Sequence, residues 1–154
     1  MKNTVASAIA AAVLVSLAGA ASAQALKPEE MIKIRKSGYS FMAWNMGKIK
    51  ANVDGDFNKE QVVAAANLVA ATANSGMGAL FAPGTDKEVA GEKTRVKPEF
   101  FEQPDKAKEL AMNFIKEANE LAKVAASGDA AAVKAQFGKT GGTCKACHDE
   151  FRKN

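Results

Sequence analysis

Residues 28–53 read PEEMIKIRKSGYSFMAWNMGKIKANV, the clearest structural pattern in the 154-residue chain. Core-type side chains recur there at alternating steps of three and four, which indicates a helix packed lengthwise against other helices. A proline followed by two acids is typical of a helix start, and Asp54-Gly55-Asp56 ends the pattern. The resulting seam consists of Ile32, Arg35, Tyr39, Met42, Met46, Ile49 and Val53.

Three further segments have helical period, and no segment of the sequence has a convincing strand pattern. Short turns separate the first helix from the second and the third from the fourth, whereas the middle connection is long. This pattern predicts an all-α fold, an antiparallel four-helix bundle with one long connection between helices 2 and 3. The expected elements are a second helix from about Asn58, whose side chain can cap it, to Ala79, a loop to about Gln103, a third helix from Pro104 to Ser127-Gly128 and a fourth capped by Asp129.

The N-terminus has the pattern of a secretory signal peptide. Lys2 is followed by an apolar run from Val5 to Ala20 and by the small-residue motif Ala21-Ser22-Ala23. We expect cleavage after Ala23, giving a signal peptide of residues 1–23 and a mature domain of residues 24–154. A membrane anchor is the alternative, but the apolar run is short for a bilayer span, and no later segment is apolar enough to span.

Two cysteines and the single histidine of the chain occur together in Cys144-Lys145-Ala146-Cys147-His148. This is the attachment pattern of c-type haem: two thiols bond to the porphyrin edge, and the next residue reaches the iron. Zinc would need a third and a fourth strong ligand besides the two cysteines, and the chain has no Cys or His outside this motif. A plain disulfide would leave His148 unexplained, and a thioredoxin-like redox pair would need a βαβ setting. We therefore expect one covalent haem c.

The mature chain has a formal charge of about +3, because Lys2 contributes one of the four net positive charges of the full sequence. Two haem propionates would reduce this further, so the charge is too weak to favour nucleic acid as a partner. No methionine follows His148, so a sixth protein ligand to iron would have to be an upstream methionine; otherwise the site is open.

Residues 24–154 resemble cytochrome c prime, a class II c-type cytochrome. The resemblance implies a four-helix bundle, often a homodimer, located in the bacterial periplasm. It also implies five-coordinate iron that binds nitric oxide and carbon monoxide, rather than an enzyme. It is carried by Gln24–Glu29, Arg35, Phe81-Ala82-Pro83-Gly84-Thr85, Lys97-Pro98-Glu99 and Cys144–Arg152.

The same resemblance implies roles for six further residues. Arg35 would approach a haem propionate, in keeping with a charge on an apolar seam that needs a partner, and Lys36 would line the haem edge. Tyr39 would cover the open face of the iron. The others are Thr94 and Arg95 near the propionates and Arg152 beside His148.

Two rival functions remain at this point. An electron carrier would use Met42 or Met46 as sixth ligand and exchange electrons with a redox protein. A peroxidase would need a distal acid or base, and no second histidine exists. Because Tyr39 falls on the distal position of the family, the gas-binding interpretation is favoured.

Overall fold

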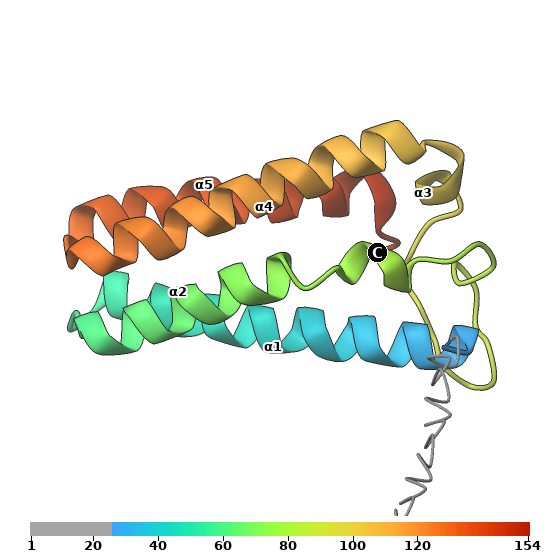
Figure 1. The fold of residues 1–154 in the computed structure, drawn as a ribbon, viewed down its shortest axis with the longest axis horizontal. Helices are drawn as coiled ribbons and strands as arrows, with labels where there is room; N and C mark the ends of the chain where they lie inside the picture. The colour runs from blue at the N-terminus through green and yellow to red at the C-terminus, as the bar shows by residue number, and fades with distance from the viewer. Residues whose placement is uncertain (1–25) are drawn as a thin grey trace, which may run out of the picture.

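The structure is a computed structural model that describes residues 26–154, so the expected signal peptide lies outside the described residues. Two antiparallel helix pairs lie against each other, with α1 beside α2 and α5, and α4 beside α2 and α5 (Figure 1). This confirms the predicted antiparallel four-helix bundle. The long helices are α1 (Pro28–Asp54), α2 (Lys59–Ala73), α4 (Pro104–Ser127) and α5 (Ala130–Phe151). Across residues 26–154, no helix has the length and apolar character that a membrane crossing needs.

The core is densest near the two short turns. Fully buried residues of all four long helices meet there, and the alanines of α2 allow its neighbours to approach closely. This cluster, which we call the turn-end core, contains Ile49, Val62, Ala65, Ala66, Leu121, Ala125 and Val133.

Side-chain caps hold the turns. The Asn58 side chain accepts a hydrogen bond from the backbone N–H of Gln61 at 2.8 Å, and Asp129 accepts from two backbone N–H groups at the start of α5. Gly128 ends α4 with a φ of 78°, a conformation that suits glycine. The caps predicted at Asn58 and Asp129 are therefore confirmed.

The second helix is shorter than its sequence period predicted. It ends at Ala73 rather than Ala79, and Met77–Leu80 forms a separate 3-10 turn, η1. The side chain of Asn74 donates to Ala70 O and to Asn119 Oδ1 on α4, both at 2.7 Å, and Gly76 has a φ of 82°. The Asn74 contacts fix the helix end, and the chain then turns at Gly76.

The long connection crosses the opposite end of the bundle (Figure 1). It contains η1 and also a short helix, α3 (Glu99–Glu102), in the stretch where only a loop was expected. Its last part pairs with the end of α5: Lys97 N donates to Phe151 O at 2.9 Å, and Lys153 N donates to Arg95 O at 2.7 Å. The connection is thereby fixed against the segment that carries the Cys-x-x-Cys-His motif.

Candidate haem site

Cys144 and Cys147 lie one turn apart on α5, half-buried and not joined by a disulfide. Burial raises the pKa of both thiols, and the neighbouring Cys147 adds to the rise at Cys144. A redox or metal-binding cysteine pair is typically activated by a lowered pKa. The setting therefore favours neutral thiols positioned for attachment over a redox-active pair.

Tyr39 of α1 faces this pair across the bundle. Burial, followed by the neighbouring Cys147 and Cys144, raises the pKa of Tyr39 to about 12. Yet its side chain is 41% exposed, whereas Arg35 and Met42, before and after it on the seam, are 2% and 5% exposed. Tyr39 on α1 and the two thiols on α5 are thus only partly covered by other protein atoms. This suits a flat group held between Tyr39 and the thiols.

Aromatic rings that we call the aromatic wall lie beside Tyr39. The ring of Phe81 stacks on Phe100 at 4.6 Å, and Phe100 meets Phe151 edge-on at 5.4 Å. Phe81 also packs edge-on against Tyr39 at 6.3 Å. Porphyrin is a large apolar ring, and aromatic side chains from three separate segments would pack well against it.

Arg35 is buried among loop groups rather than beside a carboxylate. Nη1 donates to Leu80 O at 3.1 Å and to Thr85 Oγ1 at 2.7 Å. Nη2 donates to Thr94 Oγ1 at 2.7 Å and to Thr85 O, and the guanidinium lies 4.7 Å from the Phe81 ring centre. Burial lowers the pKa of Arg35. The structure therefore brings Arg35 and Thr94 together, as the resemblance implied for a propionate site, with Thr85 as an added member.

His148 is exposed on the outer side of the thiol pair, at the end of α5. Partial burial, then Arg152 and Arg95, lower its pKa, whereas Asp149 opposes this change. The lowered pKa favours the neutral imidazole, which is the form that ligates a metal. Arg152 Nη1 lies 3.4 Å from His148 Nδ1, on the side of the imidazole to which the resemblance assigned this arginine.

The remaining predicted residues, Lys36 and Arg95, lie at the rim of the candidate haem site. Lys36 forms an ion pair with Glu92 of the long connection at 3.2 Å, and its side chain is 52% exposed. Arg95 donates from Nε to Lys153 O at 2.9 Å and lies on the His148 side rather than with Arg35. The adjacent Thr94 and Arg95 therefore serve different parts of the site.

Four residues of the site had no role assigned from sequence. Thr85 is fully buried beneath Arg35, and Lys97 donates from Nζ to Glu150 O at 2.8 Å at the end of α5. Phe81 and Phe100 form the aromatic wall. The paired aromatics at 100–101 between two prolines were the available signal for packing over a ring.

A bare metal ion finds no other site in the described chain, because residues 26–154 hold no cluster of three His, Cys, Asp or Glu side chains suited to one. The donor set is instead that of a haem: a thiol pair, an adjacent imidazole and an apolar, aromatic surround. The residues present therefore fit covalent haem.

Comparison with known proteins gives one consistent result. Residues 30–152 match the sequence profile described as cytochrome c'. The chain is 55% identical over 152 residues to cytochrome c' of Allochromatium vinosum, covering 99% of both chains. Its fold is similar to that of cytochrome c' from Thermochromatium tepidum, with 56% identity, a TM-score of 0.82, and 84% and 98% of the two chains covered.

Two other solved structures are informative. One, 57% identical with a TM-score of 0.83 and with 84% and 99% of the two chains covered, is a cytochrome c' described as having an unusual ligand-controlled dimer dissociation. Another, 28% identical with a TM-score of 0.72 and with 83% and 98% covered, is a nitric oxide complex of a mutant cytochrome c prime from Alcaligenes xylosoxidans.

Proposed function

The chain belongs to the cytochrome c' family and is thus a c-type haem protein, and we propose that its iron is five-coordinate and binds diatomic gases, chiefly nitric oxide. Cys144 and Cys147 would hold one haem, and His148 would ligate the iron. When bound, the haem supplies an open coordination position at which ferrous iron takes a diatomic ligand.

The state of Tyr39 is the observation that carries this proposal. It faces the thiol pair, and burial is the largest cause of its raised pKa of about 12, so the phenol stays neutral at physiological pH. A neutral phenol is a poor ligand for ferrous iron. Tyr39 would therefore crowd the open face without occupying the iron, and a small gas would still enter.

Core packing of the two methionines argues against the electron-carrier alternative. Met42 is buried in a cluster with Val69, Ala73 and Ala118, and Met46 packs against both this cluster and the turn-end core. A methionine released to ligate iron would leave a cavity in that packing, which costs about 2–5 kcal/mol for a truncation of this size.

The absorption spectrum of the reduced protein tests the coordination state, followed by titration with carbon monoxide and nitric oxide. We expect a high-spin spectrum that changes on adding either gas, and faster gas binding in Tyr39→Ala. Met42→Leu and Met46→Leu are the matched controls, and their spin state should equal that of the wild type. A low-spin wild type that becomes high-spin in either methionine variant would establish the electron-carrier function instead.

We also propose export to the periplasm and pairing of two copies through the outer face of α1. Ile34, Phe41 and Trp44 are 44%, 45% and 58% exposed there, and Phe41 and Trp44 pack on each other at 5.7 Å. Sedimentation with and without carbon monoxide tests the pairing, and a monomer at all concentrations would reject it.

N-terminal analysis of the native protein should give residue 24, and retention of Met1 would reject the export step.

A further inference from the structure

A polar pocket of about 410 Å³ lies beside His148, and neither Tyr39 nor a ring of the aromatic wall lines it. The end of α5 forms one side, and the last part of the long connection forms the other. Backbone hydrogen bonds between Lys97 and Phe151 and between Lys153 and Arg95 fix the two sides together. This histidine pocket is lined by Arg95, Lys97, His148, Asp149, Arg152, Lys153 and Asn154.

The cations of the histidine pocket are held by neutral groups. Arg95 Nε donates to Lys153 O at 2.9 Å, Lys97 Nζ donates to Glu150 O at 2.8 Å and to Asp149 O at 3.2 Å, and Lys153 Nζ donates to Asp86 O at 2.9 Å. Carbonyl oxygens position these cations without neutralising them.

Ion pairs elsewhere in the described chain differ from these carbonyl contacts. In the described part of the chain, six lysines pair with carboxylates, and none of the four cations lining the histidine pocket is among them. The carboxylate of Asp149 at the pocket is already paired with Lys145, which does not line it. The four cations that line the pocket therefore outnumber its one lining side-chain carboxylate, that of Asp149.

The imidazole of His148 supplies a further hydrogen-bond donor at the pocket. If Nε2 of His148 ligates the iron, as the proposed function implies, the proton is on Nδ1. A metal-bound histidine normally donates this N–H to a carboxylate, a carbonyl or water. Here the neighbouring side-chain atom is Arg152 Nη1, at 3.4 Å, which is itself a donor. Two donors side by side can share one acceptor.

We propose that the histidine pocket binds a small inorganic oxyanion, such as phosphate, between Arg152 and the Nδ1–H of His148. This inference rests on the proposed haem ligation by His148. The oxyanion would accept from the guanidinium and from the imidazole, while Arg95, Lys97 and Lys153 would supply the surrounding positive field. Accepting from Nδ1–H makes the imidazole a stronger donor to iron, which favours the ferric state.

The test uses the haem-loaded protein, with phosphate replacing chloride at constant ionic strength and pH. The reduction potential should fall and saturate with phosphate. Arg152→Gln should raise the phosphate concentration needed for half-saturation by about tenfold or more, because a charge-assisted hydrogen bond is lost. Arg152→Lys should recover part of the lost affinity. Lys123→Gln, on the exposed face of α4, is the matched control and should bind phosphate as the wild type does.

Calorimetry with phosphate gives a readout that does not depend on the iron potential. Binding in the wild type and its loss in Arg152→Gln would support the site. A potential that follows ionic strength alone, or an equal response in Arg152→Gln and Lys123→Gln, would overturn the inference while leaving the haem function intact. A chain that carries no covalent haem would overturn the proposed function first.

Discussion

The inner faces of the same helices are buried to different degrees at the two ends of the bundle. At the end with the short turns, the side chains of the turn-end core are fully buried and mostly small. At the other end, Tyr39 remains 41% exposed and the two thiols are half-buried, while a long connection rather than a turn crosses over them. One end is completed by protein alone, and the other is the end at which we propose that the haem is held.

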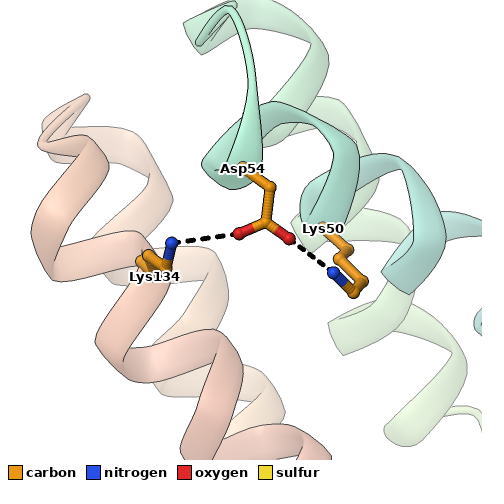
Figure 2. A network of polar contacts seen from close by, with 3 residues as sticks. All are labelled: Lys50, Asp54 and Lys134. Atoms are coloured by element: carbon orange, nitrogen blue, oxygen red, sulfur yellow. Dashed lines mark hydrogen bonds and ion pairs between the residues drawn. The ribbon is translucent and has the colours of Figure 1, made fainter.

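Polar groups follow the same division. At the turn end, Asp54 pairs with Lys50 of its own helix and with Lys134 of α5, at 3.0 Å for the second pair (Figure 2). At the haem end, Arg35, Arg95, Lys97, Arg152 and Lys153 have carbonyls, hydroxyls or an imidazole as partners instead. The Asp54 network thus pairs charge with charge, whereas these five cations have neutral partners. At the same end, only the exposed Lys36 and Lys145 among the residues discussed pair with carboxylates, those of Glu92 and Asp149.

Truncation in the turn-end core should have the largest effect on stability. Leu121→Ala removes a fully buried side chain between close-packed helices, so we expect the free energy of unfolding to fall by about 3 kcal/mol. Urea denaturation of the haem-loaded protein measures this, and the absorption spectrum should stay unchanged. A changed spin state would show that the two ends are mechanically coupled and would break the comparison.

Replacing Arg35 should have the next largest effect, concentrated at the haem end. Arg35→Met leaves the acceptors at Leu80, Thr85 and Thr94 without their donor. We expect a loss of about 2 kcal/mol in the haem-loaded protein and faster amide exchange in residues 81–96. Arg35→Lys keeps the charge but not the fork of donors, so it should be intermediate. Unchanged exchange in the loop would contradict the structural role.

The same division decides what the sequence could predict. The period of α1, the caps at Asn58 and Asp129, and the spacing of Cys144, Cys147 and His148 are local patterns, and each is expressed within a few residues of chain. The caps and the overall bundle were therefore predicted correctly.

What the sequence could not predict depends on contacts between distant residues. The end of α2 is set by Asn74 bonding to Asn119, 45 residues away. Thr85 gains its role from Arg35, 50 residues away, and the aromatic wall joins three separate segments. A charge on an apolar seam did indicate that Arg35 needed partners, but no local pattern specified which ones.

A pair of glycine substitutions should sharpen the comparison with effects of opposite sign. Gly128 has a φ of 78°, and an added Cβ would lie 2.7 Å from Lys59 Cδ. Gly128→Ala should therefore cost about 1 kcal/mol. Gly138 is inside α5, where an added Cβ would meet nothing within 4 Å, so Gly138→Ala should stabilise by about 0.5–1 kcal/mol. Thermal unfolding measures both, and equal signs would show that the turn is not under conformational constraint.

The ion pairs at Asp54 should have the smallest effect and the clearest pH dependence (Figure 2). Hydrogen bonds from Lys50 and Lys134 lower the pKa of Asp54 below its ordinary value of 3.8. A lowered pKa in the folded state means that the unfolded state binds the proton first, so the stabilisation is present at neutral pH and is lost as the pH falls through the folded value.

Asp54→Asn should thus be slightly less stable than the wild type at pH 7, and the difference should shrink below pH 3.8 and also with added salt. Urea denaturation across this pH range measures the difference, with Asp56→Asn, next to the same turn, as the control. A gap between Asp54→Asn and the wild type that does not change with pH would mean that the Asp54 carboxylate acts through packing rather than through its charge.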